Sequence, residues 1–148
     1  MDESEVLRRV LAREEIVALS YAYAEALDTR RFDDLREILA ETVRADYGGY
    51  TCDGIDAFLE MVVSHLGGCG PSQHLFSNHR VEVDNDRAGM RFYAAIMHAG
   101  SGEQSDRFFN VWSEYSVELQ RRDQHWVVTR MDQRPIKFEG DMSILKPA

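Results

Sequence analysis

The hydrophobic pattern of this chain changes its period once, near residue 74. Before that point apolar residues recur at helical spacing, and after it they alternate with polar residues as they do in β-strands. Helices therefore come first and strands follow, without the strand–helix–strand alternation of parallel sheets. This order predicts an α+β fold, in which three N-terminal helices pack on a curved, mixed but mostly antiparallel sheet. The curved sheet and the helices together form a cone that encloses a cavity.

Three helices are expected in the first half of the chain. Residues 3–28 keep helical spacing without an interrupting glycine or proline. A short helix is expected over residues 33–39 and a third over 55–66, which stops at Gly67 and Gly68. Between these two helices, the segment VRADYGGY is typical of a strand that runs into a Gly-Gly turn.

Four strand-like runs begin at His74, and short polar segments join them. The runs are HLFSNHRVEV, AGMRFYAAIMHA, DRFFNVWSEYSVEL and HWVVTRMDQRPI, with linking segments short enough for hairpins. Strand alternation places His74 on one face with Phe76 and Asn78, and His98 on one face with Phe92. Both histidines can therefore look into one cavity. The tail FEGDMSILKPA is apolar enough to dock, and a neighbouring subunit is the expected surface.

One face of the third strand run is predicted to be a cavity wall. It is apolar except for one hydroxyl and one phenol. Its residues are Phe109, Val111, Ser113, Tyr115, Val117 and Leu119.

Composition favours a soluble globular protein, and the length is that of one domain, expected to span residues 1–148. The formal net charge of −9 argues against nucleic acid as a partner and against an anionic membrane surface. The N-terminal segment MDESEVLRRV is too acidic and polar for a signal peptide, and no stretch approaches the ~18 apolar residues of a membrane span. The expected location is the cytoplasm.

The sequence carries no recognisable motif for a nucleotide, a cofactor or a metal ion. GxGxxG, P-loop, HExxH and CxxC patterns do not occur. Cys52 and Cys69 lack neighbours that would stabilise a thiolate and are expected to be packing residues. We therefore expect no cofactor and no metal, so that side chains alone supply the chemistry.

Asp28 and His74 are the candidate pair for that chemistry, although they lie far apart in the sequence. A carboxylate that orients a histidine makes a general base without a metal. Asp28 ends a helix, where the macrodipole disfavours a carboxylate unless a cation or a donor compensates it. Two plainer interpretations stay open at this point. Asp28 can cap the turn that follows it, and His74 can be a half-exposed loop residue.

Several sequence blocks in order resemble the SnoaL-like branch of the NTF2-like superfamily, and within it the scytalone dehydratases. The resemblance covers roughly residues 10–132. Its blocks are ALDTRRFDDLREIL, VRADYGGY, FLEMVVSHLGG with PSQHLFSNHRVEV, and RRDQHWVVTRM. The same branch includes bile-acid dehydratases and a dehydrochlorinase.

This resemblance assigns roles to individual residues. It implies that Asp28 and His74 form the catalytic base, and that Tyr47 binds a carbonyl group or positions a water molecule. Four further residues are implied to bind substrate: Tyr23, His98, Ser113 and Tyr115.

Three of these positions depart from the scytalone dehydratase pattern. Leu27 stands where that family has a tyrosine, and Tyr115 stands where it has an asparagine. His98 lies about one strand step from the family's second histidine. These departures argue against scytalone itself as the substrate.

The function implied by the resemblance is that of a cofactor-independent, dehydratase-type lyase. Its substrate is expected to be a small cyclic, aromatic or polyketide-like molecule. Two alternatives remain open, an isomerase or polyketide cyclase that begins with the same proton abstraction, and a non-catalytic cone that binds a small molecule. The resemblance also implies a homo-oligomer, with a trimer favoured over a dimer.

Overall fold

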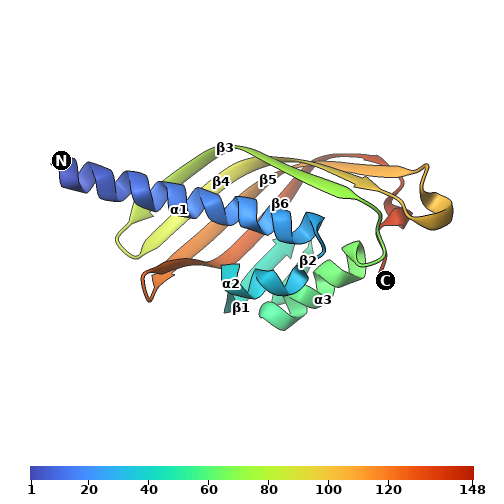
Figure 1. The fold of residues 1–148 in the computed structure, drawn as a ribbon, viewed down its shortest axis with the longest axis horizontal. Helices are drawn as coiled ribbons and strands as arrows, with labels where there is room; N and C mark the ends of the chain where they lie inside the picture. The colour runs from blue at the N-terminus through green and yellow to red at the C-terminus, as the bar shows by residue number, and fades with distance from the viewer.

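The computed structural model describes residues 1–148 and contains one six-stranded sheet with three α-helices against one of its faces (Figure 1). The helices are α1 (Glu3–Asp28), α2 (Leu35–Ile38) and α3 (Ile55–Leu66), with 3-10 turns at Phe32–Asp34, Gly102–Gln104 and Met142–Ile144. The strands are β1 (Leu39–Tyr47), β2 (Tyr50–Asp53), β3 (Ser72–Asp84), β4 (Arg87–Ala99), β5 (Phe108–Arg122) and β6 (His125–Gly140). None of the helices has the length and apolar content needed to cross a bilayer.

The sheet confirms the predicted α+β architecture. Its strand order is β2-β1-β6-β5-β4-β3, in which only β1 and β6 pair in parallel. Long antiparallel hairpins therefore join the last four strands, as their spacing predicted. Strand β2 was not predicted. After a turn in which Gly48 and Gly49 have φ of +67° and +104°, four residues return along β1. A strand of four residues is too short to show a clear alternation.

Only the second half of α1 packs on the sheet. Ile16 and Tyr23 are almost fully buried, whereas Val6 and Val10 stay 45% and 50% exposed. Figure 1 shows the N-terminal turns of this helix extending past the strands. Asp2 caps the N-terminus of this helix, because its carboxylate accepts a hydrogen bond from the Glu5 amide at 2.8 Å. Helical spacing predicted the helix correctly but not how much of it reaches the core.

The core lies between the inner face of the sheet and the helices. The apolar face predicted for the third strand run is confirmed, because all six of its members on β5 are buried. His98 and Phe92 were predicted to share one face of β4, and both are buried on its inner face.

Strand β3 departs from the predicted alternation after Ser77. The register with β4 shifts between Ser77 and Arg80, and Asn78 adopts a left-handed φ of +59°. His74 and Phe76 keep the inner face, but Asn78 is exposed and His79 turns inward instead. The placement of Asn78 beside His74 was therefore wrong. A bulge adds one residue to one strand, and the hydrophobic pattern gives no sign of it.

The C-terminal tail docks on its own domain, not on the expected neighbouring subunit. Ile144 is completely buried, and the Lys146 amide donates to the His65 carbonyl at 2.9 Å. In return, the Lys146 carbonyl accepts from the Gly68 amide at 2.8 Å. The tail therefore fixes the end of α3 beside the mouth of the cavity.

Candidate active site

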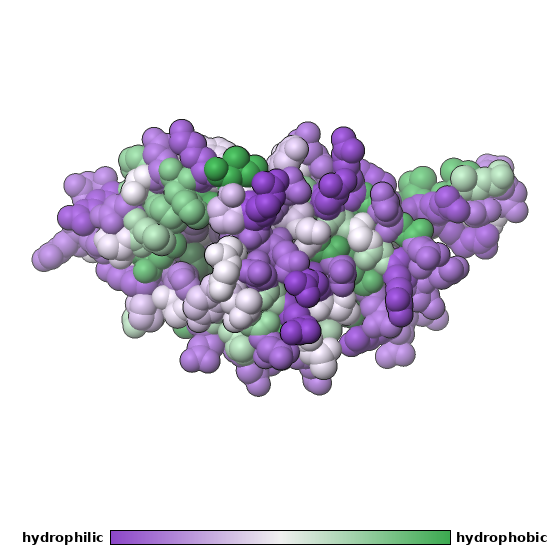
Figure 2. Space-filling model, turned by 180° about the vertical axis from the view of Figure 1, so that it is seen from behind, coloured by the Kyte–Doolittle hydropathy of each residue, from purple (hydrophilic) through white to green (hydrophobic).

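The protein contains a small apolar cavity between α1, α3, the inner face of the sheet and the C-terminal tail. Its volume is about 210 Å³, and 13 of its 18 lining residues are hydrophobic. Figure 2 shows hydrophobic side chains gathered around a hollow at the end of the molecule opposite the protruding N-terminus. The polar or titratable groups on the cavity wall come from Tyr23, Tyr47, Tyr50, His65, His74, His98, Tyr115 and Gln133.

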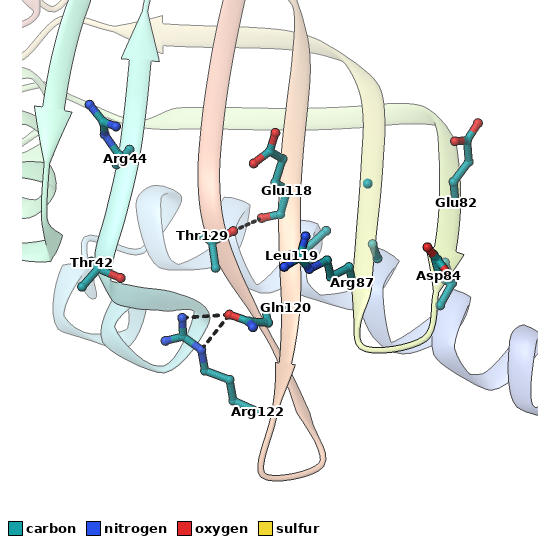
Figure 3. Close-up of a pocket in the computed structure, with 13 residues that line it drawn as sticks. Thr42, Arg44, Glu82, Asp84, Arg87, Glu118, Leu119, Gln120, Arg122 and Thr129 are labelled. Carbon is teal, nitrogen blue, oxygen red and sulfur yellow. Dashed lines mark hydrogen bonds between the residues drawn. The ribbon is translucent and has the colours of Figure 1, made fainter.

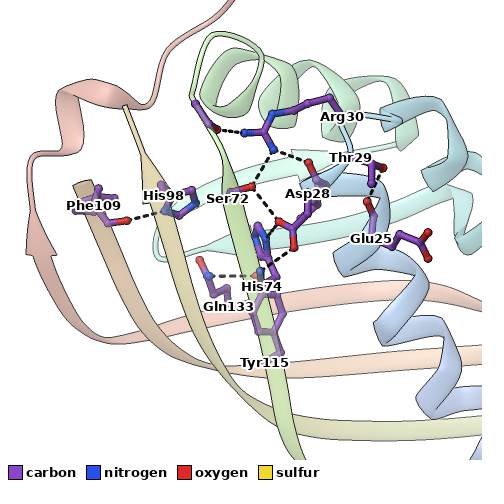
Figure 4. A network of polar contacts seen from close by, with 12 residues as sticks. Glu25, Asp28, Thr29, Arg30, Ser72, His74, His98, Phe109, Tyr115 and Gln133 are labelled. Carbon is purple, nitrogen blue, oxygen red and sulfur yellow. Dashed lines mark hydrogen bonds and ion pairs between the residues drawn. The ribbon is translucent and has the colours of Figure 1, made fainter. Parts of the chain in front are cut away.

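The side chains of Asp28 and His74 meet at one wall of this cavity (Figure 4). Asp28 is the last residue of α1, and His74 lies near the start of β3. The His74 Nδ1 atom is 2.6 Å from Asp28 Oδ1, and the His74 backbone amide donates to Oδ2 at 2.8 Å. The two contacts hold the carboxylate in one orientation. The plainer interpretations, a turn cap and a half-exposed loop histidine, do not describe these residues, since His74 is buried.

A second layer of hydrogen bonds holds Asp28 in place. Ser72 donates to Asp28 Oδ1 at 2.9 Å, and Arg30 donates to the Ser72 hydroxyl at 2.8 Å. Arg30 adopts a left-handed φ of +60° just after the helix and also donates to the carbonyls of Leu27 and Gly70. This cation near the C-terminal end of α1 supplies the compensation that the helix macrodipole requires.

The environment of Asp28 favours its ionised form. Burial alone raises the pKa of this carboxyl, but the hydrogen bonds from His74 and Ser72 outweigh that effect and hold the pKa below its ordinary value. A carboxylate only accepts hydrogen bonds, so the proton of neutral His74 lies on Nδ1. The Nε2 atom of His74 then carries a free lone pair on the cavity side of the ring. This is the arrangement of a general base.

His98 lies beside His74 on the neighbouring strand β4. The two imidazole rings are 5.8 Å apart and nearly perpendicular, and both line the cavity. The Nδ1 atom of His98 is 2.8 Å from the carbonyl oxygen of Phe109. Burial lowers the pKa of His98 to about 4, and the bond to Phe109 opposes this only in part. At neutral pH, His98 is therefore an uncharged ring.

Three tyrosines form the other polar wall of the cavity. The hydroxyls of Tyr23 and Tyr47 are 2.5 Å apart, and Tyr47 also donates to the Met131 sulfur at 3.2 Å. The ring of Tyr115 lies against both, with ring centroids 6.5 Å from Tyr23 and 6.2 Å from Tyr47. Burial raises the pKa of all three phenols above the ordinary value. They stay protonated and can donate hydrogen bonds.

Gln133 connects this wall to Ser113. Its side-chain amide donates to the Tyr115 hydroxyl at 3.1 Å and to the Ser113 hydroxyl at 3.3 Å. Gln133 lines the cavity, whereas Ser113 is buried behind it and does not. Ser113 contacts the cavity wall through Gln133 and not directly, and its binding of substrate stays a prediction. Opposite this point, β6 has one extra residue, Ile136, between the partners of Trp112 and Ser113.

The structure thus brings together six of the seven residues singled out from the sequence. Tyr23, Tyr47, His74, His98 and Tyr115 line the cavity, and Asp28 supports His74 from behind. Sequence reasoning missed Arg30 and Gln133. Neither an arginine next to a second one, Arg31, nor a glutamine in a strand carries a distinguishing signal. Nowhere in the structure do three or more His, Cys, Asp or Glu side chains come close enough to hold a metal ion.

A larger hollow lies on the opposite face of the sheet, near the hairpin ends. This polar groove has a volume of about 750 Å³ and is lined by 13 residues, of which three are hydrophobic. Figure 3 shows its side chains on β1, β3, β4, β5 and β6, with α1 behind the sheet. Its charged residues are three cations and three anions: Arg44, Arg87, Arg122, Glu82, Asp84 and Glu118. The groove is remote from the Asp28–His74 pair.

Residues 8–132 match the SnoaL-like domain family. An uncharacterised protein of Mycobacterium tuberculosis strain H37Rv is 32% identical over 124 residues, which span 80% of this chain and 81% of the relative. The chain belongs to the SnoaL-like domain family. This membership confirms the resemblance seen in the sequence blocks, and family and fold agree with each other.

Solved structures share the fold of this SnoaL-like protein. A hexachlorocyclohexane dehydrochlorinase from Novosphingobium barchaimii superposes with a TM-score of 0.76 at 20% identity, covering 96% of this chain and 98% of its own. A proposed scytalone dehydratase from Novosphingobium aromaticivorans superposes with a TM-score of 0.80 at 16% identity, covering 94% of each chain. At these identities the likeness establishes the fold.

Proposed function

We propose that this SnoaL-like protein is a cofactor-independent, dehydratase-type lyase in which residues 1–148 act as one domain. The observation that carries the proposal is the 2.6 Å contact between Asp28 and His74 Nδ1, which leaves His74 Nε2 free on the wall of an apolar cavity. Two structural relatives, a proposed scytalone dehydratase and a hexachlorocyclohexane dehydrochlorinase, support the same reaction class.

The first step is the removal of a proton from carbon. His74 Nε2 takes a proton from a carbon next to a carbonyl group, and the bonding electrons move to the carbonyl oxygen to form an enolate. Asp28 stabilises the resulting imidazolium through Nδ1 and does not need to move. The apolar wall keeps water away, which strengthens each electrostatic contact.

Tyr47 is the proposed donor to the enolate oxygen. Its proton is directed at the sulfur of Met131, which is a weak acceptor. A negatively charged oxygen is a far better acceptor, so the proton turns to it without breaking a strong bond. The partner hydroxyl of Tyr23, 2.5 Å away, polarises Tyr47 further. The two hydroxyl oxygens are already in place before the charge develops, and only the Tyr47 proton has to rotate.

The second step is the loss of a hydroxyl group as water. The enolate electrons return to form the new carbon–carbon double bond, and the carbon–oxygen bond breaks. The proton held on His74 Nε2 goes to the departing oxygen, so the base is regenerated. His98 cannot supply this proton at neutral pH, because burial lowers its pKa to about 4. His98 therefore keeps only the substrate-binding role that the family resemblance implies.

The size and chemistry of the cavity narrow the substrate class. At about 210 Å³ it is smaller than the ~300–1,000 Å³ typical of ligand pockets, which favours a molecule of one or two rings. Aromatic side chains line it, so a cyclic, aromatic or polyketide-like ketone that carries a hydroxyl group fits best. A steroid is too large for the cavity in this form.

Two further proposals concern assembly and location. Tyr93 and Ile136 stay 50% and 58% exposed and line a shallow hollow on the outer face of the sheet, which supports association into a homo-oligomer. We propose a trimer, to be tested by sedimentation equilibrium, and a cytoplasmic location, to be tested by a fluorescent fusion.

Product mass tests the proposed reaction. Purified protein is incubated with a panel of cyclic β-hydroxy ketones, and products are followed by mass spectrometry. We expect the loss of one water molecule with at least one ketone, and no loss with His74→Gln. His79→Gln is the matched control, since it replaces a partly buried histidine on the same strand outside the cavity. A product of unchanged mass would indicate an isomerase or cyclase. Equal turnover by His74→Gln and the wild type would refute the role of His74.

A further inference from the structure

His98 is held in one protonation form by its neighbour. The Phe109 carbonyl oxygen, 2.8 Å from Nδ1, can only accept a hydrogen bond. Nδ1 must therefore carry the proton of the neutral ring, and Nε2 must carry a lone pair. No protein group pairs with Nε2, although the ring lies in the cavity wall. The low pKa of His98 agrees with this form at neutral pH.

The cavity is thus divided into two chemically different ends. At one end, His74 and His98 both present free Nε2 lone pairs, from rings 5.8 Å apart. At the other end, Tyr47, Tyr115 and Gln133 supply hydroxyl and amide protons. The lone pair of His74 Nε2 is the base in the proposed reaction, and the lone pair of His98 Nε2 has no role in it.

The cavity wall also lacks a fixed charge. None of its 18 lining residues is Lys, Arg, Asp or Glu. Arg30, the nearest cation of the network, is occupied by Ser72 and two backbone carbonyls. A carboxylate or phosphate on the ligand would be desolvated without a partner, which is strongly unfavourable.

We infer that His98 is a specificity-determining hydrogen-bond acceptor, which selects uncharged ligands that present a hydroxyl or another donor group beside the carbon facing His74. The inference rests on the proposed function only for the position of that carbon. Ligand binding alone shows this selectivity, because the His98 acceptor and the uncharged wall act on the ligand before any proton is transferred. His98 is therefore a binding residue of the site, distinct in role from the base.

Matched ligands of one shape test this inference. 2-Naphthol and 2-methylnaphthalene differ only by a hydroxyl in place of a methyl group, and 2-naphthoate adds a negative charge. Their dissociation constants are measured by NMR titration with wild type, His98→Asn and His98→Gln. His98→Asn keeps a side-chain amide that can donate to Phe109 but has no atom at the Nε2 position. His98→Gln places an amide near that position. Met61→Leu is the control for altered packing, since it changes an apolar residue of the same wall at similar volume.

We expect His98→Asn to reduce the preference for 2-naphthol over 2-methylnaphthalene about fivefold, the value of one hydrogen bond. His98→Gln should retain part of the preference, and Met61→Leu all of it. 2-Naphthoate should bind the wild type at least about tenfold more weakly than 2-naphthol. An unchanged preference in His98→Asn, or tight binding of 2-naphthoate, would overturn the inference. These results do not depend on turnover, so they stand even if His74 is not a base.

The protonation form of His98 can be observed directly. In a ¹⁵N-labelled sample at pH 7, the Nε2 resonance should have the shift of an unprotonated nitrogen and Nδ1 that of a protonated one. The His98 Nε2 signal should move toward that of a hydrogen-bonded nitrogen when 2-naphthol is added. A protonated Nε2 in the free protein would contradict the inference.

Discussion

The apolar cavity and the polar groove lie on opposite faces of one sheet. Polar side chains are buried in the cavity and exposed to solvent in the groove. On β5, Tyr115 points into the cavity and is almost fully buried, while Glu118 is exposed in the groove. The groove has more than three times the volume of the cavity, about 750 Å³ against 210 Å³. Volume and charge alone would therefore favour the groove over the cavity that holds the Asp28–His74 pair.

The difference lies in what surrounds each polar atom. Exposed charges are screened by water, and such pairs contribute little to stability or reactivity. In the cavity, His74, His98, Tyr23 and Tyr115 are buried, and each side chain is held by a specific hydrogen bond, as His74 is by Asp28. Low local polarity makes these contacts stronger and shifts the pKa of the groups involved. Chemistry is expected where polar groups are few, buried and oriented.

The largest change among the supporting residues is expected for Asp28→Asn, which keeps the size of the side chain and removes its charge. An amide NH₂ facing Nδ1 of His74 donates a hydrogen bond, so the imidazole proton moves to Nε2 and the free lone pair is lost from the cavity. We expect proton transfer to fall by roughly 10²- to 10⁴-fold. Deuterium exchange into a cyclic ketone measures it, with Asp46→Asn as the control on β1. A wild-type rate of deuterium exchange in Asp28→Asn would show that proton transfer does not depend on the Asp28–His74 pair.

A smaller loss is expected for Tyr47→Phe, which removes the proposed donor to the enolate oxygen. One such donor is typically worth about 10²- to 10³-fold in rate. Tyr23 can replace it in part, because its hydroxyl lies only 2.5 Å away, so we expect the lower end of this range. The control is Tyr50→Phe, at another position of the cavity wall. Equal losses in both variants would mean that the phenols act only through packing.

The stability of the protein should depend on pH through His98. Burial lowers its pKa from 6.5 to about 4, so between these values the unfolded chain binds a proton that the folded chain does not. The uncharged ring therefore contributes fully to the free energy of unfolding above pH 6.5, and this contribution is lost as the pH falls toward 4. It amounts to about 2 kcal/mol between pH 7 and pH 5. Urea unfolding should show this difference in the wild type but not in His98→Asn.

The smallest effect is expected in the groove. Arg122 donates two hydrogen bonds to Gln120 at 3.2 and 3.0 Å, but both side chains reach solvent. We expect Arg122→Ala to change the free energy of unfolding by less than about 0.5 kcal/mol and to leave exchange unchanged. A large loss of deuterium exchange in Arg122→Ala would show that the groove, and not only the cavity, contributes to proton transfer.

The sequence predicted the fold well because its main determinants are local. The change of hydrophobic period near His74 separates helices from strands, and Gly67 with Gly68 ends α3. The bulge at Asn78 was not predictable, because one inserted residue leaves the composition of the strand unchanged. It moves His79 inward and sends Asn78 to solvent.

The site was predictable only where the family resemblance supplied partners. Asp28 and His74 carry no local sign that they meet, since their contact depends on how α1 crosses β3. Arg30 and Gln133 belong to residue types that are common on surfaces and strands, so their roles appear only in three dimensions. Ser113 lies on the predicted buried face of β5, but strand alternation does not show which residues of that face reach the cavity.

The central claim is that His74 removes a proton from carbon inside the cavity. Deuterium incorporation into 2-tetralone, followed by proton NMR in D₂O, tests it without knowledge of the natural substrate. The wild type and His79→Gln should accelerate exchange beside the carbonyl group above the buffer rate, and His74→Gln should reduce that acceleration by about 10²-fold or more. Equal acceleration by His74→Gln, or none by the wild type, would contradict the claim.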